Sequence, residues 1–253
     1  MQPNAPRKLA SAACLAALVA SAPLAADKVL VMRSHTDAMQ MMGTKTPAQD
    51  IDHEYWFGPN GTRFDAGETS VIVRTDAKKL YFVNHDARTY STINLPFTFE
   101  QIVPDEMAPM IEMMMKSMAA STTVTPTDRT GEFAGVSCNY SKVNISMGMM
   151  QMAMDICSTE KLPIDISRYK ALQEMQGELA PNSQWIKEMA EKIKGFPVRS
   201  DTSTTVMGKT FGSSSELTKV EDRPAPAGQY DPPAGYQEVK YDPMAQAQAR
   251  KKK

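Results

Sequence analysis

The chain has 253 residues, of which 42% are hydrophobic and 23% are charged, and its 28 Lys and Arg residues nearly balance 29 Asp and Glu residues. This composition suits a folded globule and excludes a multispan membrane protein, and the balanced charge gives no sign of a basic nucleic-acid-binding domain. The unusual numbers are 20 Met and only 3 Cys. We therefore expect no nucleic-acid partner.

The N-terminus has the layout of a cleaved secretory signal. Two basic residues precede an apolar, Ala-rich run from Leu9 to Val19, and small residues end at Ala26. The run is shorter than the roughly 20 residues that a transmembrane helix needs. We therefore expect residues 1–26 to be removed on export to the periplasm and residues 27–244 to form one domain.

Short strand patterns separated by turn signals fill the next part of the chain. They lie at Val29–Met32, Tyr55–Phe57, Thr62–Phe64, Val71–Arg74, Lys79–Val83 and Thr89–Ile93, and Gly58-Pro59-Asn60-Gly61 is a clear turn. A parallel crossover needs a dozen or more residues, and the later strands are closer together than that. The pattern predicts an antiparallel meander.

A helical insertion is predicted at about 104–119. Pro104, Asp105 and Glu106 suit a first helical turn. Apolar residues then recur at helical spacing, namely Met107, Met110, Ile111, Met114 and Met118. One face of this helix is expected to be rich in thioethers.

The next segment reads as a hairpin closed by a disulfide. Two alternating segments flank the turn region Ser146–Met149, and Met150, Met152 and Met154 alternate on the second strand. A register in which Val143 faces Met152 and Ile145 faces Met150 places Cys138 directly opposite Cys157. In an exported chain this pair is expected to be oxidised.

Further helices are predicted within about 167–194, followed by short strands. One helix runs from about Ser167 to Leu179, and Asn182 or Ser183 caps another that ends at Gly195. Strands follow at Thr204–Met207 and Ser215–Val220, after Gly212–Ser215, which reads as a flexible turn. The polar, aperiodic end at 245–253 is expected to be a disordered basic tail, and its Arg250–Lys253 cluster allows weak contact with an anionic membrane surface.

Three motifs resemble those of a family of secreted bacterial proteins. They are Leu80–Tyr90 (LYFVNHDARTY), Gly135–Tyr140 (GVSCNY) and Tyr230–Val239 (YDPPAGYQEV). Members are similar in architecture to the periplasmic lipoprotein-localisation carriers. The resemblance implies an α+β fold: a curved antiparallel sheet, or half-open barrel, with helices packed on or plugging the concave face. It assigns no functional residues.

No catalytic signature is present. The three histidines are scattered and form no zinc-binding motif, and the chain has neither a Gly-x-Ser-x-Gly elbow nor a phosphate-binding glycine loop. We therefore expect a protein that is not an enzyme.

The methionines support three interpretations. They are ordinary core residues, or they line a cleft that adapts to an apolar small molecule or acyl chain, or their thioethers bind copper. The cleft interpretation names Met107, Met110, Ile111, Met114, Met118, Met150, Met152 and Met154. The copper interpretation names His35, Met39, Met41 and Met42.

The leading hypothesis is a periplasmic protein that binds a lipid or lipoprotein acyl group in a Met-lined cleft, without a cofactor. The alternatives are a periplasmic copper-binding protein and a structural or interaction module of the cell envelope. The sequence names no protein partner.

Overall fold

The computed structural model describes residues 26–41, 44–97, 109, 120–179 and 184–242. Most of the strands form one twelve-stranded sheet in the order β14-β8-β7-β6-β5-β4-β1-β13-β12-β11-β10-β9. Their bounds are β1 Asp27–Thr36, β4 Gln49–Phe57, β5 Gly61–Ala66, β6 Thr69–Arg74, β7 Lys79–Asn84, β8 Thr89–Asn94, β9 Ala120–Phe133, β10 Val136–Met147, β11 Met150–Thr159, β12 Phe196–Val206, β13 Lys209–Arg223 and β14 Gln237–Glu238. A separate hairpin pairs β2 (Met39–Met41) with β3 (Thr44–Thr46).

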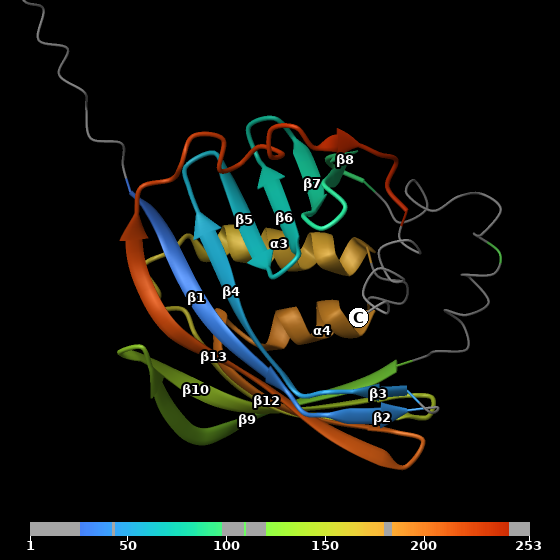
Figure 1. Ribbon diagram of the computed structural model, residues 1–253. Coiled ribbons are helices and arrows are strands. Elements are labelled where there is room, and N and C mark those ends of the chain that lie inside the picture. The colour runs from blue at the N-terminus through green and yellow to red at the C-terminus, as the bar shows by residue number, and fades with distance from the viewer. Residues whose placement is uncertain (1–25, 42–43, 98–108, 110–119, 180–183, 243–253) are drawn as a thin grey trace, which may run out of the picture.

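The large sheet is antiparallel except where β14 pairs with β8, and it is not closed. It curves around helices α3 (Ile166–Leu179) and α4 (Gln184–Lys192), which lie on its concave side (Figure 1). The predicted fold class, a curved antiparallel sheet with helices on the concave face, is confirmed. The predicted meander is also confirmed, because β4 to β8 pair in chain order.

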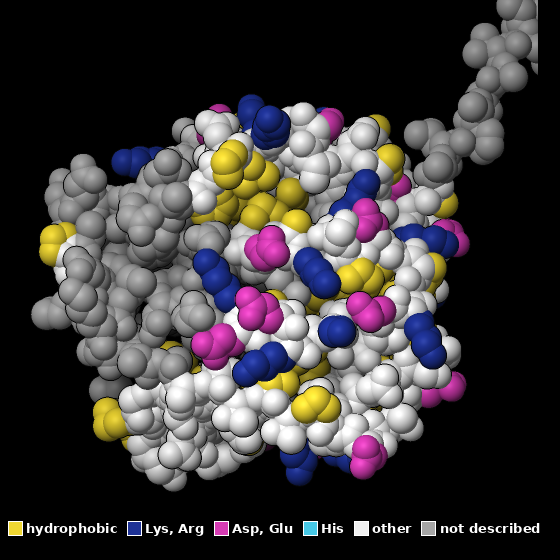
Figure 2. Space-filling model, turned by 180° about the vertical axis from the view of Figure 1, so that it is seen from behind, with side chains coloured by type: hydrophobic (Ala, Val, Ile, Leu, Met, Phe, Trp, Pro, Cys, Tyr) yellow, Lys and Arg dark blue, Asp and Glu magenta, His cyan; other side chains and the backbone are white. Residues whose placement is uncertain are grey.

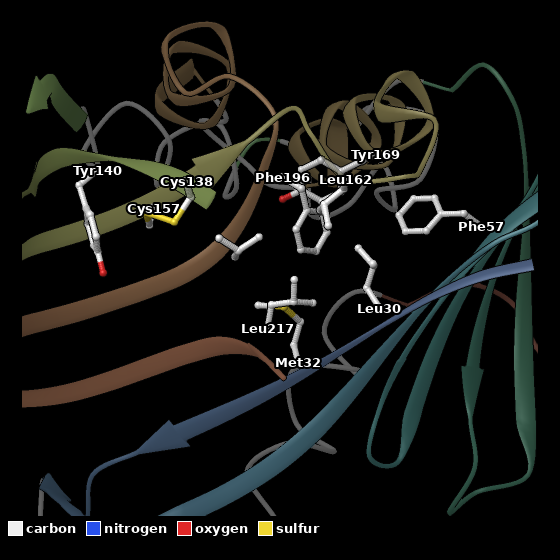
Figure 3. Close-up of a cluster of buried hydrophobic side chains, with 11 residues drawn as sticks. Leu30, Met32, Phe57, Cys138, Tyr140, Cys157, Leu162, Tyr169, Phe196 and Leu217 are labelled. Atoms are coloured by element: carbon white, nitrogen blue, oxygen red, sulfur yellow. A yellow bond between two sulfur atoms is a disulfide. The ribbon is translucent and has the colours of Figure 1, made fainter. Parts of the chain in front are cut away.

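β1 joins the two halves of the sheet. It pairs with β4 of the meander on one side and with β13 on the other, so that the first and last long strands are neighbours. Its apolar residues Leu30 and Met32 are buried and point, with Leu217 of β13, toward Phe196 (Figure 3). This central core fixes the angle between the meander and the remaining hairpins.

The C-terminal segment covers the outer face of the meander. The Tyr230 side chain lies over Gly58 and Gly61, where a Cβ atom would come within 2.5 Å of its hydroxyl oxygen and 3.0 Å of its ring, respectively. The hydroxyl donates a hydrogen bond to buried Asp27. Further along, β14 adds to the edge of the sheet beside β8. The meander is therefore covered on both faces, with α3 on its inner side.

The disulfide between Cys138 and Cys157 is present, with a Cα–Cα distance of 5.4 Å. The predicted register is wrong by two residues, because Val143 faces Met154 and Cys157 faces Tyr140. Gly148 has a φ of 56°, which permits a two-residue hairpin turn and extends both strands further toward their tips than predicted. An even shift leaves every side chain on its predicted face.

Two other predictions need correction or lie outside the described residues. Gly212–Ser215 is part of β13 and not a turn, because these residues pair with β12 and, from Ser213, with β1. The Gly212 N–H donates to the Asp37 carboxylate, which lies 2.7 Å from where a Cβ atom would be. The predicted helix at 104–119, including Met107, Met110, Ile111, Met114 and Met118, lies outside the described residues apart from Pro109. The same is true of the predicted signal up to residue 25, of the caps at 182 and 183, and of the tail at 245–253.

Candidate ligand-binding site

A strip of apolar side chains crosses the concave face of the meander. Tyr55 of β4 is paired with Phe64 of β5, Phe64 with Val71 of β6, and Val71 with Phe82 of β7. Directly opposed residues of antiparallel strands project from the same face, so these four form one continuous row, which we call the apolar strip. All four are only half-buried, although they lie on the inner side of the sheet.

Helix α3 borders the apolar strip. Asp165 caps this helix, because its side chain accepts a hydrogen bond of 3.0 Å from the N–H of Ser167. The hydrogen bond from the Ser167 hydroxyl, together with this cap, holds the pKa of Asp165 below its usual value. Leu172 and Met175, further along α3, pack in the same apolar cluster as the strip. The helix therefore covers part of the row and leaves the rest accessible.

The strip leads to a hollow at the β8 edge of the sheet. The hollow has a volume of about 490 Å³ and is lined by Thr92, Ile93, Asn94, Phe97, Glu238, Val239, Lys240 and Tyr241. Tyr241 connects it to the strip, since its ring centroid lies 4.9 Å from that of Phe82. Lys240 is exposed at its rim. Seen from behind, hydrophobic side chains gather in a recess at the upper left of Figure 2, on the side of the molecule where the meander lies.

A neutral imidazole lies next to the strip. His53 stacks on Phe64 with 5.7 Å between ring centroids, and its Nδ1 is buried without a hydrogen-bond partner among the described residues. Burial lowers the pKa of His53. Because the ring is uncharged at neutral pH, it adds one polar atom to an apolar surface without adding a charge.

The methionines of the predicted cleft lie in a second apolar cluster. Met152 and Met154 are half-buried on β11 and pack with Met189 and Ile193, which belong to α4 and to the turn after it. Met150 lies at the end of β11, opposite Met147 of β10. The structure thus brings Met152 and Met154 to helix α4, and the predicted helix at 104–119 lies outside the described residues apart from residue 109.

The residues of the predicted copper site are partly outside the described residues. His35 Nδ1 lies 2.8 Å from Asp50 and its Nε2 lies 3.4 Å from Asp37, so both ring nitrogens face carboxylates. Met39 is half-buried in the β2–β3 hairpin, whereas the side chain of Met41 and all of Met42 are not described. Among the described residues, no group of three or more His, Cys, Asp and Glu side chains is arranged to hold a metal ion.

One cluster resembles a hydrolase triad but has a structural explanation. His85 Nε2 lies 2.7 Å from Ser70 Oγ, which also donates to Asp65. Ser70 is only 1% exposed, and the other ring nitrogen of His85 lies 3.1 Å from the hydroxyl of Tyr236 in the C-terminal segment. The cluster therefore holds the C-terminal segment on the outer face of the meander. The buried hydroxyl of Ser70 has no access to a substrate.

Sequence reasoning missed the apolar strip although it predicted the strands that form it. Both faces of the meander carry apolar residues: Ile72 and Val83 on the outer face are buried, as are Val73 and Leu80 on the inner one. The only local signal was the aromatic content of Tyr55, Phe64 and Phe82, which does not say which face is concave.

Comparisons with known proteins agree with the motifs described above. No curated protein matches the chain. None of the helices in the described part of the chain is long and apolar enough to cross a membrane. A family model described as a domain of unknown function (DUF4412) matches residues 36–236, which include the meander, the disulfide hairpin, both helices and the first part of the C-terminal segment. The chain therefore belongs to the DUF4412 family.

Proposed function

We propose that the protein is a periplasmic, non-enzymatic carrier that binds an apolar chain, such as a lipid or a lipoprotein acyl group, along the apolar strip. The single observation that carries this proposal is the half-buried row Tyr55–Phe64–Val71–Phe82 on the inner side of an open sheet. The resemblance of the three sequence motifs to proteins built like the lipoprotein-localisation carriers supports the same function.

The energetics favour a chain-like ligand over a compact polar one. Side chains of this kind contribute roughly 25 cal/mol for each Å² of apolar surface removed from water, so a ligand that completes the burial of the strip gains from every residue it covers. The hollow beside β8 has a volume within the range of roughly 300–1,000 Å³ that is typical of small-molecule sites. Exposed Lys240 at its rim suits an anionic headgroup.

Neighbouring residues of β7 provide a matched test. Phe82 faces the strip, while Tyr81, the preceding residue, faces outward and lies near Tyr90. The full chain is titrated with a fluorescent long-chain fatty acid. We expect saturable binding that Phe82→Ser weakens about tenfold, because apolar contact worth about 1.4 kcal/mol is lost, and that Tyr81→Ser leaves unchanged.

Two outcomes of this titration would count against the proposal. A flat titration of the parent chain would favour the structural or interaction module. Equal weakening by both substitutions would indicate a general loss of stability and not a site on the inner face, and thermal unfolding of each variant distinguishes that case.

Copper binding through His35, Met39, Met41 and Met42 is the other candidate and stays a prediction. Its test is the capture of Cu(I) by the full chain, which replacement of the three methionines by Leu should abolish. Both ring nitrogens of His35 face carboxylates, so a copper ion would have to displace one of these contacts.

A further inference from the structure

Three hairpins end at the same end of the sheet. The pairs Ala120–Met147, Met147–Met150, Met150–Val206 and Val206–Lys209 form one row across β9 to β13, so the β10–β11 and β12–β13 turns are neighbours. The β2–β3 hairpin joins them, because Lys209 Nζ donates a hydrogen bond of 3.2 Å to the carbonyl of Gln40. In Figure 1 these elements meet at the lower right. We call this region the hairpin end.

Methionines project from the hairpin end into solvent. Met149 in the β10–β11 turn is 72% exposed, and Met207 in the β12–β13 turn is 63% exposed. The other large hydrophobic residues that are exposed in the described part of the chain, Ile51 and Val239, reach only 39% and 41%. The two most exposed apolar side chains therefore lie on adjacent turns.

The backbone at Met207 favours a different residue. Met207 has a φ of 51° and Gly208 a φ of 76°, which are the left-handed values of a two-residue hairpin turn. An Asn at position 207 would adopt this left-handed conformation with less steric strain than Met. Neither its backbone conformation nor packing within the protein accounts for an apolar side chain at this position.

The charged side chains of the hairpin end are all positive. The segments 39–46, 120–125, 146–151 and 204–210 contain no Asp or Glu and two lysines, Lys45 and Lys209. Both lysines are exposed. Figure 2 shows this end of the molecule at its lower left, where most side chains are uncharged and a hydrophobic one protrudes.

We propose that the hairpin end docks on the surface of an anionic lipid bilayer, with Met149 and Met207 entering the headgroup region and Lys45 and Lys209 contacting lipid phosphates. Small apolar turns flanked by lysines suit this partner, since flexible thioethers insert between lipids and lysines near an anionic surface attract its headgroups. This surface is separate from the apolar strip. It would bring the protein to a membrane without a spanning segment.

The test uses the full chain and two kinds of vesicle, phosphatidylglycerol mixed with phosphatidylcholine and phosphatidylcholine alone. Sedimentation with the vesicles should show binding that prefers the anionic vesicles and weakens with salt. The variant carrying Met149→Ser and Met207→Asn should bind about tenfold or more weakly. Asn suits the backbone of residue 207, so the substitution does not threaten the fold. The matched control, Ile51→Ser, removes an exposed apolar side chain from β4, outside the hairpin end, and should bind like the parent.

A second variant, with Lys45→Gln and Lys209→Gln, should lose most of the preference for anionic vesicles and keep residual binding to neutral ones. The proposal is overturned if the parent chain binds neither kind of vesicle, or if the methionine variant binds as tightly as the parent. The second result would assign any membrane contact to another part of the chain, such as the C-terminal tail.

Discussion

At the scale of single residues, the three histidines have different environments that predict different titrations. The hydrogen bond that His35 donates to Asp50 raises the pKa of His35 above 6.5, whereas burial lowers the pKa of His53 and of His85 below it. His35 therefore stabilises the fold at low pH, and this contribution is lost as the pH rises through its folded pKa. His53 and His85 act in the opposite direction, since stability falls as the pH drops from 6.5 toward their folded pKa values.

A titration followed by NMR of the imidazole protons checks this assignment. We expect His35 to titrate last as the pH is raised, and Asp50→Asn to shift its titration to lower pH without moving that of His53. Three histidines that titrate together would contradict the environments described for them.

Two glycines provide a second test at the residue scale. Gly195 has a φ of 85°, and a Cβ atom there would lie 2.1 Å from the backbone oxygen of Thr159. Gly208 has a similar φ of 76° but open space around it. Gly208→Ala should therefore cost only the left-handed backbone penalty of about 1–2 kcal/mol, and Gly195→Ala at least about 3 kcal/mol. Denaturant unfolding of both variants measures the difference, and equal losses would mean that the approach of Thr159 is not close.

At the scale of elements, the disulfide holds the β10–β11 hairpin at the end away from its turn. Replacing Cys138 and Cys157 by Ser opens a loop with a sequence separation of 19 residues and should lower the free energy of unfolding by about 3 kcal/mol. Chemical denaturation of the double variant checks this value. Unchanged stability would show that strand pairing alone determines the hairpin.

The elements that the sequence predicted best are those with local signals. The turn Gly58–Gly61 and the short connections between β6, β7 and β8 set the meander, and helical spacing located α3 to within a residue of its start at Ile166. The predicted register of the disulfide hairpin is wrong because the two-residue turn at Gly148 sets the strand pairing, and the two cysteines need not be directly opposed to bond. The sequence around Gly212 suggests a turn because the contact of Gly212 with Asp37 involves a residue 175 positions away and leaves no local signal.

The candidate site was harder to predict, because it depends on contacts between distant parts of the chain. The pairing of β1 with β13 curves the sheet, and the C-terminal segment covers the outer face of the meander. Only these contacts decide which face of β4–β8 becomes concave. The sequence Tyr81-Phe82-Val83 is apolar or aromatic throughout, so it is equally compatible with Phe82 on the concave face and with Phe82 on the outer face.

At the scale of the whole molecule, the two proposed surfaces lie on different parts of one open sheet. The apolar strip lies on the meander beside α3, and the hairpin end lies on the strands β9 to β13. Such a separation allows the protein to approach a membrane with one part and to hold an apolar chain with another. Each proposal can fail without the other.

The export of the protein stays a prediction that a mass measurement tests. Asp27 begins β1 and is buried under Tyr230, so a chain cleaved after Ala26 keeps the whole of this strand. The intact mass of the chain recovered from the periplasm should correspond to a start at Asp27. A mass that includes residues 1–26 would contradict cleavage at this point.

The most direct test of the central claim is to locate an acyl chain on the concave face of the meander. Tryptophan is introduced in place of Phe82 or, in a second variant, Tyr81, and its fluorescence is measured above that of the parent chain while a brominated fatty acid is added. The account predicts saturable quenching of the tryptophan at position 82 and little quenching at position 81, because adjacent residues of β7 point to opposite faces. Equal quenching at both positions, or none at either, would contradict it.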